Sequence, residues 1–195
     1  QSGLGRNVKV DNKPLISLGT NDYLGIANNS HIKEAAIKTL DEFGVSMCGT
    51  PIVIGQTTIN KRLEIETASF LKQEDALVFP SCYQCNMGVF SLLANKEDVI
   101  ITDKKIHSSL LNGIGLCDSL FKVFPHNNTS KLEQALKRYQ ERRMRFIVVE
   151  GLYSTDGDVA PLREIAELAK RYNAFIILDD AHSVGVLGRE GRGLL

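Results

Sequence analysis

Five short apolar runs, rich in Val, Ile and Phe, recur along the chain and constrain its fold more than any other feature. They occupy residues 76–79, 99–102, 121–124, 146–149 and 175–178. Each run begins 22 to 29 residues after the previous one, and runs of this length and composition are typical of buried strands. Between them lie helix-like stretches, such as residues 130–143 and 162–172, with apolar residues every three to four positions. This alternation predicts an α/β fold with a mainly parallel sheet buried on both faces.

Two more helices are expected before the first run, over residues 30–43 and 57–72. Each has a hydroxyl side chain placed to cap its amino end, and Gly44 ends the first. Residues 45–55 are apolar but contain glycines and Pro51, which favours a loop that passes close to other backbone.

The overall charge and length favour small-molecule chemistry. Lys plus Arg and Asp plus Glu each number 23, so no net field draws the chain to nucleic acid or to an anionic membrane. No apolar run approaches the roughly 20 residues that span a bilayer, and the first nine residues lack the layout of a secretory signal. Four cysteines are too few for a disulfide framework in a chain this long. We expect a cytoplasmic protein with no membrane span and with reduced cysteines.

Polar residues follow four of the apolar runs, where an α/β sheet binds its ligands. They lie at residues 80–83, 103–107, 150–158 and 179–182. In open α/β sheets the ligand site lies beyond the carboxyl ends of the strands. We therefore expect all four segments to open onto one rim of the sheet.

Asp179 is the most informative of these residues because it follows directly on the apolar run at 175–178, with His182 three residues later. It could cap the following segment or pair with a lysine. It could instead be a metal ligand, a contact to a nucleotide ribose, or an acid that keeps the ring nitrogen of a cofactor protonated. Spacing alone does not choose among these interpretations.

The segment after the first run, Ser81 to Asn86, is expected where a strand turns into a helix, and free N–H groups at such a helix start suit a phosphate. Its Cys82-x-x-Cys85 pattern could be half of a zinc site or a redox pair. A second cysteine pair is missing, so we expect no metal site. His107 precedes another helix-like stretch, where a histidine can either begin the helix or act in catalysis.

Four glycines fall between residues 185 and 193, near the end of the chain. They lack the G-x-G-x-x-G order that opens a helix after the first strand, so a nicotinamide cofactor is weakly supported. An α/β sheet rarely finishes on a glycine loop, and we therefore expect the domain to be truncated here.

Taken in order, six blocks of residues give the chain a resemblance to the α-oxoamine synthases, a family of the fold type I pyridoxal-phosphate enzymes. These blocks are residues 21–25, 63–64, 103–109, 124–127, 150–158 and 179–193. The resemblance implies an acyltransferase that condenses an amino acid with an acyl-CoA, with decarboxylation. It also implies pyridoxal 5'-phosphate as cofactor and a homodimer.

The resemblance assigns catalytic roles to three residues. Asp179 would keep the pyridine nitrogen of the cofactor protonated. His182, together with Ser154, would hydrogen-bond the phenolic oxygen, and His107 would stack on the ring.

It also implies three contacts that bind the cofactor or the substrate. Backbone N–H groups of Cys82 and Tyr83 would hold the phosphate of the cofactor. Asn21 would contact the carboxylate of the amino acid. Residues 1–45 would form an N-terminal segment with the first helix, and residues 46–195 the N-terminal part of the cofactor-binding large domain, without the C-terminal domain.

Several departures from the family pattern leave alternatives open. The lysine that carries the cofactor follows the aspartate by about thirty residues in the family, whereas sixteen residues follow Asp179 here. Pro51 and Asn60 replace an arginine and a histidine that are usual in the family, and Cys82 replaces a common glycine. A non-catalytic partner subunit and another fold type I enzyme are the two alternative interpretations.

Overall fold

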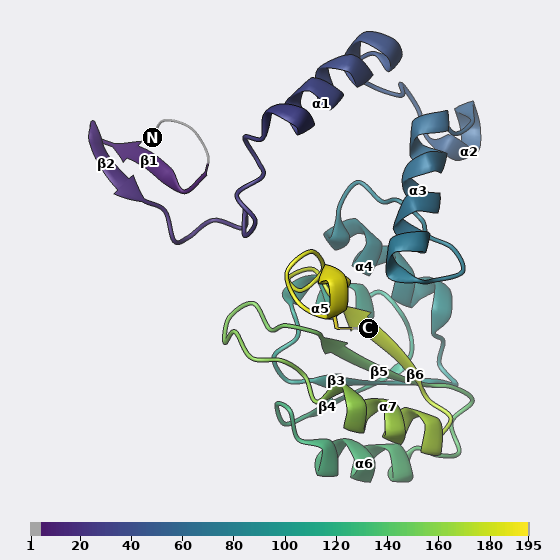
Figure 1. Ribbon diagram of the computed structural model, residues 1–195. Helices are drawn as coiled ribbons and strands as arrows, with labels where there is room; N and C mark the ends of the chain where they lie inside the picture. The colour runs from purple at the N-terminus through teal and green to yellow at the C-terminus, as the bar shows by residue number, and fades with distance from the viewer. Residues whose placement is uncertain (1–4, 195) are drawn as a thin grey trace. The chain divides into compact units, whose positions relative to one another are not determined.

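The computed structural model describes residues 5–194, which fall into two compact units divided between Ala76 and Leu77 (Figure 1). The first unit contains a hairpin and three helices: β1 (Asn7–Val10), β2 (Lys13–Ile16), α1 (Ser30–Phe43), α2 (Pro51–Ile54) and α3 (Thr58–Leu71). Asp11 and Asn12 join the two strands with φ of 48° and 61°, the conformation that suits a tight antiparallel hairpin. No helix among the described residues is both long and apolar enough to cross a bilayer.

The two helices expected in this unit are confirmed within one residue at each end. The hydroxyl cap expected for each helix is confirmed only at α3, where Thr57 accepts from the amide of Asn60. At α1 the cap is an amide side chain instead, because Asn29 accepts from the first-turn amides of His31 and Ile32. The loop expected over residues 45–55 is corrected in part, because α2 forms inside it. Pro51 stands at the first position of α2, where its missing N–H has no intrahelical partner to lose.

The second unit is an α/β sheet with helices on both faces. Its elements are α4 (Cys82–Leu93), β3 (Val99–Asp103), α5 (Ser108–Ile114), β4 (Leu120–Phe124), α6 (Thr129–Arg138), β5 (Arg145–Glu150), α7 (Leu162–Arg171), β6 (Phe175–Asp179) and η1 (Arg189–Gly191). The four strands pair in the order β4-β3-β5-β6, and every pairing is parallel. The prediction of an α/β fold with a mainly parallel sheet is confirmed.

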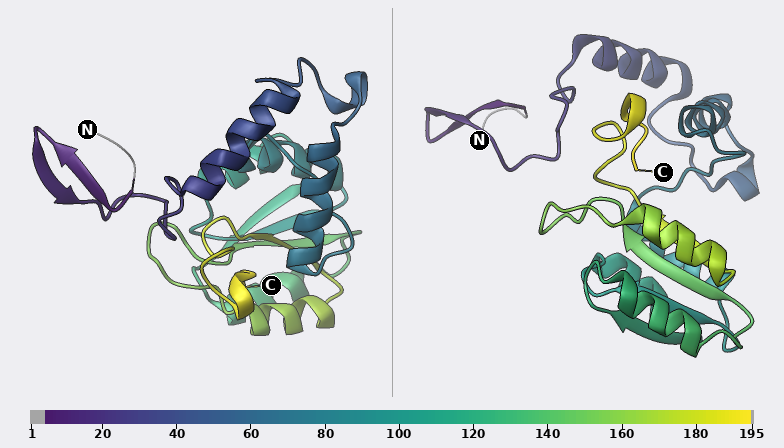
Figure 2. Two further views of the ribbon diagram at one scale, coloured as in Figure 1. Left: turned by 45° about the horizontal axis from the view of Figure 1, so that its top comes forward. Right: turned by 60° about the horizontal axis from the view of Figure 1, so that its bottom comes forward.

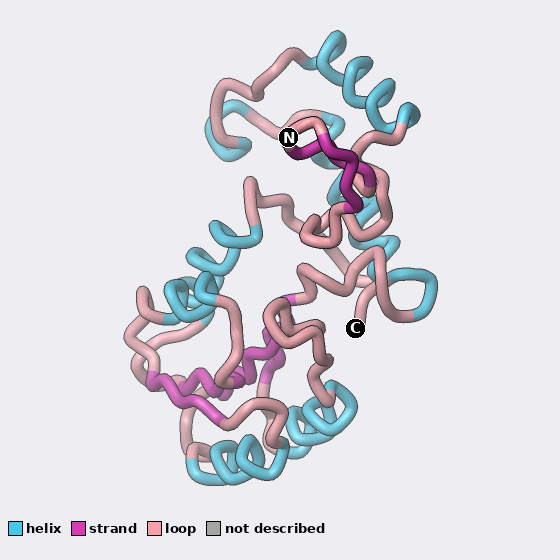
Figure 3. Tube along the Cα trace, turned by 90° about the vertical axis from the view of Figure 1, so that its left-hand side faces the viewer, coloured by secondary structure: helices cyan, strands magenta, loops and turns pink. Residues whose placement is uncertain are grey.

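Alternate side chains of the central strands divide the core between the two faces. On one face, Ile101 and Ile147 pack with residues of α6 and α7. On the other, Ile100 and Val148 pack with residues of α4 and α5. Figure 2 shows α6 and α7 side by side along their face, and Figure 3 shows helices on either side of the strands. Both faces are therefore buried, as the near-continuous apolar runs require.

The expected strand at residues 76–79 is not formed, and this prediction was wrong. No described strand pairs with the segment, and Leu77 is 75% exposed. An apolar run becomes a strand only where a neighbouring strand takes up its backbone hydrogen bonds. The local composition was that of a strand, but the described sheet has no strand beside this segment.

Helix α6 ends at Arg138, five residues before the end expected from the sequence. The guanidinium of Arg145 donates to the backbone oxygens of Gln140 and Arg142, at 2.6 and 2.7 Å. These carbonyls accept hydrogen bonds from a buried cation and not from backbone amides of a next helical turn. A contact from the next strand thus shortens the helix.

The glycine-rich segment after β6 wraps around the carboxylate of Asp180. Ser183 Oγ donates to one oxygen of Asp180, and the amide of Leu194 donates to the other at 3.0 Å. A Cβ on Gly193 would lie 2.0 Å from Asp180 Oδ2, and the φ of Gly193 is +86°. Glycine is needed here both for space and for backbone conformation.

Candidate functional site

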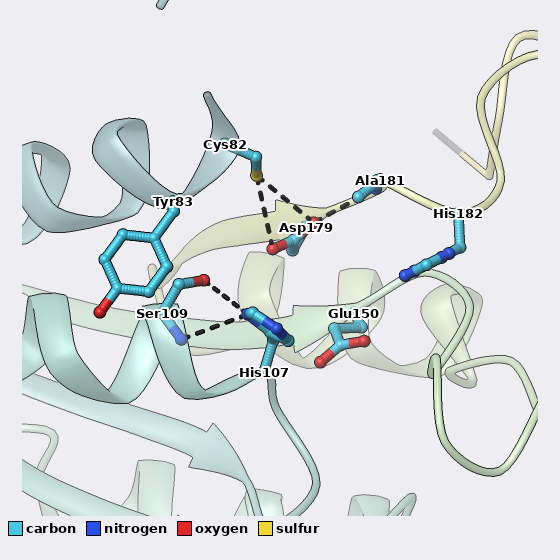
Figure 4. A pocket seen from close by; sticks show the side chains of 8 residues that line it. All are labelled: Cys82, Tyr83, His107, Ser109, Glu150, Asp179, Ala181 and His182. Atoms are coloured by element: carbon cyan, nitrogen blue, oxygen red, sulfur yellow. Dashed lines mark hydrogen bonds between the residues drawn. The ribbon is translucent and has the colours of Figure 1, made fainter. Parts of the chain in front are cut away.

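A pocket opens at the carboxyl ends of β5 and β6 (Figure 4). It encloses about 370 Å³, including some open solvent. The residues that line it come from the ends of two strands, the starts of two helices and the segment after β6: Cys82, Tyr83, His107, Ser109, Glu150, Asp179, Ala181 and His182.

Asp179 lines this pocket, and the groups that hydrogen-bond its carboxylate are neutral. Asn86 Nδ2 donates to its Oδ2 at 3.2 Å, and the amide of Ala181 donates to its Oδ1 at 3.2 Å. The thiol of Cys82 lies 3.8 Å from Oδ2. Within residues 5–194 no lysine or arginine forms an ion pair with Asp179. The interpretation of Asp179 as the partner of a lysine therefore has no support, and the carboxylate is available to a cationic ligand.

The two cysteines of the Cys82-x-x-Cys85 pattern are free thiols on the first turn of α4. Burial and the nearby charge of Asp179 raise the pKa of both thiols. Reactive cysteines need a lowered pKa, because the thiolate is the nucleophile. The redox interpretation is thus disfavoured, because burial and the acidic neighbour both favour the protonated thiols.

His107 is held in a fixed orientation at the start of α5. Its Nδ1 accepts from the amide of Ser109 at 3.2 Å and lies 2.8 Å from Ser109 Oγ. This is the N-cap position of the helix, so the histidine both begins α5 and faces the pocket. A role for His107 in beginning the helix is therefore compatible with a role in catalysis, the two interpretations that the sequence left open.

Glu150 is a buried carboxyl group at the pocket wall. The strand register places it directly beside Asp179 on the neighbouring strand. Its Oε2 accepts from the amide of Ser154 at 3.4 Å, and the backbone amide of His107 also lies near the carboxyl group. Its Oε1 is buried and accepts no hydrogen bond of good geometry from the described residues. Burial raises the pKa of Glu150, with the charge of Asp179 as a smaller contribution. An unpartnered buried oxygen at a pocket wall indicates a place for a ligand or a proton.

The structure brings five of the seven candidate residues from the sequence to this pocket: Cys82, Tyr83, His107, Asp179 and His182. The side chain of Ser154 is exposed and does not line it, although the amide of Ser154 reaches Glu150. Asn21 lies in the first unit, and its side chain is exposed there.

Sequence reasoning missed Asn86 and Ser109. Asn86 is buried, and its Nδ2 lies 2.9 Å from Ser109 Oγ as well as within reach of Asp179. One signal was present: Asn86 lies four residues after Cys82, on the same face of a helix that begins at the site. A polar residue on the buried face of such a helix is a candidate partner for the group that faces it.

The arrangement suits a flat organic ligand with an anionic group and a protonated ring nitrogen. The amides of Cys82 and Tyr83 belong to the first turn of α4, where backbone N–H groups have no partner inside the helix. They are suited to an anion. The Asp179 carboxylate can accept from an N–H⁺ group, and the imidazole of His107 offers an aromatic face.

Comparisons with known proteins give one consistent result. The aminotransferase class I and II family model matches residues 13–193. The chain is 42% identical over 186 residues to 8-amino-7-oxononanoate synthase of Bacillus pumilus, with 95% of this chain and 47% of the relative covered. It is 37% identical over 191 residues to the mitochondrial 2-amino-3-ketobutyrate coenzyme A ligase of Bos taurus, with 97% and 46% covered.

Solved structures of serine palmitoyltransferase have the same fold. The enzyme of Sphingomonas wittichii matches with a TM-score of 0.92 at 35% identity, over 96% of this chain and 47% of that one. The enzyme of S. paucimobilis with bound PLP and myriocin matches with a TM-score of 0.94 at 31% identity, over 99% and 48%. The chain therefore spans about half the length of the relatives that it matches.

Proposed function

The chain belongs to the aminotransferase class I and II family, and from this premise we propose that the full-length protein is a pyridoxal-phosphate-dependent acyltransferase. It would condense an amino acid with an acyl-CoA, with decarboxylation, as an α-oxoamine synthase. The observation that carries the proposal is the Asp179 carboxylate, which has no lysine or arginine partner among residues 5–194 and lines a pocket together with His107 and His182. The relatives named above, a synthase, a coenzyme A ligase and two serine palmitoyltransferases, support this choice of reaction.

The residues of the pocket fit pyridoxal 5'-phosphate. When bound, this cofactor supplies an electron sink for a carbanion at the α-carbon of the amino acid. Asp179 would hold the proton on the pyridine nitrogen, and Asn86 keeps the carboxylate turned toward the pocket. The first-turn amides of Cys82 and Tyr83 would bind the phosphate.

Three further roles complete the proposed site. The ring of His107, oriented by its contacts with Ser109, would stack on the cofactor. His182 and Ser154 would hydrogen-bond the phenolic oxygen of the cofactor. Asn21 would contact the carboxylate of the amino acid.

Reduction with borohydride tests this proposal on the full-length protein. Pyridoxal phosphate is added, the protein is reduced, and peptide mass mapping locates any lysine that carries the reduced cofactor. We expect an adduct about thirty residues beyond Asp179. Absence of an adduct, with that lysine region present, would contradict the catalytic proposal and favour a non-catalytic partner subunit.

Replacement of Asp179 tests the residue that carries the proposal. The variant Asp179→Asn should keep the fold and lower the release of CoA from acyl-CoA by about a hundredfold or more, since a neutral amide does not hold the ring proton. Asp118→Asn, a change at an exposed aspartate of the same unit, is the matched control and should retain wild-type turnover. Unchanged turnover in Asp179→Asn would overturn the assignment.

We further propose that the full-length protein is a cytoplasmic homodimer, and that residues 46–195 are the N-terminal part of its cofactor-binding large domain. Sedimentation of the active enzyme tests the dimer: a fully active monomer would contradict it. Fractionation of the source cells tests the compartment.

A further inference from the structure

His126 lies between two carboxylates, one on each ring nitrogen. Its Nδ1 is 2.9 Å from Asp103 Oδ1, and its Nε2 is 2.8 Å from Asp158 Oδ2. A neutral imidazole has one N–H group and can donate to only one of them, whereas the imidazolium donates to both. The side chain of Asp103 is 1% exposed, and its second oxygen accepts from the amide of Asn127 at 2.8 Å. The geometry is therefore satisfied by a cationic His126 between two ionised aspartates.

This contact joins the ends of two strands to the segment of residues 151–159, which we call the site loop. Asp103 ends β3, His126 follows β4, and Asp158 belongs to the site loop. Asn127 adds two bonds to the same loop, from its Nδ2 to Asp158 Oδ2 at 3.0 Å and to the backbone oxygen of Val159 at 3.2 Å. The loop is thus held at its carboxyl end by a small set of side chains.

The site loop begins at the pocket. Glu150, which lines the pocket, immediately precedes it, and the amide of Ser154 within the loop donates to Glu150. Tyr153 is buried and its ring meets that of His126 edge to face, with 4.5 Å between centroids. Its amide donates to the backbone oxygen of Asp158 at 2.9 Å. A change at His126 can therefore reach Ser154 and Glu150 through one short, internally bonded loop.

The groups around His126 favour its charged form. Burial lowers the pKa of His126, but hydrogen bonds to Asp103 and Asp158 outweigh this, and the net pKa is raised. The hydrogen bond to His126 lowers the pKa of Asp158 in return. Two other groups lie near this cluster: Lys105, which pairs with Asp156 at 2.7 Å, and Tyr153, whose pKa is raised by burial, so that it stays a neutral phenol.

We infer that His126, held as an imidazolium between Asp103 and Asp158, is a positioning residue that fixes the site loop at the cofactor pocket. The contacts alone support the charge of His126 and its role in holding the loop in place. The effect on cofactor binding rests on the proposed function. Because the folded-state pKa of His126 is raised, the contact is complete below the ordinary histidine pKa of about 6.5 and is lost as the pH rises through the folded value. The loop should loosen as the pH rises through that folded-state pKa.

The test uses the full-length protein and three variants. His126→Asn keeps a short amide that can reach one aspartate but cannot bridge both. Asp158→Asn removes one carboxylate at a side chain that is 46% exposed, and it keeps the test valid if the first variant does not fold. Asp156→Asn is the matched control, since it breaks an ion pair of the same loop without touching His126.

Three quantities are measured: the protonation of the His126 ring by nitrogen-15 NMR, amide hydrogen exchange over residues 151–159, and the affinity for pyridoxal phosphate. At pH 7 we expect both ring nitrogens to carry protons. Exchange of the site loop should be about tenfold faster in His126→Asn and Asp158→Asn, with a matching loss of cofactor affinity. Asp156→Asn should behave as wild type.

A neutral ring at pH 7, or wild-type exchange in both variants of the contact, would overturn the inference. Faster exchange with unchanged cofactor affinity would overturn the positioning role. If the wild-type protein binds no pyridoxal phosphate, the proposed function fails, and the ring protonation and loop exchange still decide the charge of His126 and its hold on the loop.

Discussion

Replacement of Asn86 by alanine tests how the pocket holds Asp179. Asn86 is buried at the start of α4, and its side-chain amide donates to two oxygens and lies 3.6 Å from the sulfur of Cys82. One is the carboxylate of Asp179 at 3.2 Å, and the other is the hydroxyl of Ser109 at 2.9 Å. The variant Asn86→Ala removes both bonds and leaves the Asp179 carboxylate with the amide of Ala181 and the thiol of Cys82 as its described donors.

The magnitude follows from the kind of bond that is lost. A hydrogen bond to a charged group contributes about 1.5–3 kcal/mol, and one between neutral groups about 0.5–1.5 kcal/mol. The free energy of unfolding should therefore fall by about 2–4 kcal/mol. Of the two bonds that Asn86 makes, the one to Asp179 orients the carboxylate. Its loss should lower the affinity for pyridoxal phosphate by about 10- to 100-fold.

The assay is a titration of the full-length protein with pyridoxal phosphate, followed by the absorbance of the bound cofactor, alongside urea unfolding. Phe90→Leu, at a core position one turn further along α4, is the control, since it should lower stability by about 1–2 kcal/mol without touching Asp179. Wild-type affinity in Asn86→Ala, or an equal loss of affinity in Phe90→Leu, would refute the orienting role.

Two further predictions concern buried charge. Burial raises the pKa of Glu150, so the folded protein binds that proton more tightly than the unfolded chain, and stability falls as the pH rises from the unfolded pKa of about 4.3 through the folded one. Glu150→Gln should lack this part of the pH dependence in urea unfolding between pH 4 and 8, and identical slopes would contradict it. Arg145 is 7% exposed and donates to four backbone oxygens, so Arg145→Met should lower the free energy of unfolding by about 3 kcal/mol. Arg138→Ala, at an exposed position, should cost less than about 1 kcal/mol in the same assay.

The regular elements of the second unit were largely predictable because their signal is local. Four of the five apolar runs became strands within one or two residues of their expected ends. The exception, residues 76–79, had the same composition but no pairing strand among the described residues. The end of α6 was misplaced for a similar reason, since the buried cation that binds the carbonyls of the residues after α6 belongs to β5. Both errors arise where a partner distant in sequence overrides a local preference.

The residues of the candidate site also fall into those that the sequence predicts and those that only the tertiary structure reveals. The sequence by itself determined that polar residues follow the strands, and a parallel sheet brings such residues to one edge, so the grouping of His107, Asp179 and His182 was accessible in advance. Only the tertiary structure decided that Asn86 reaches Asp179 across 93 residues, and that His126 meets both Asp103 and Asp158. The spacing of apolar residues can be read from a few consecutive residues, because it reflects which side chains face the core. Hydrogen bonds between elements depend on strand order and on how closely helices approach, and these are set by packing over the whole sheet.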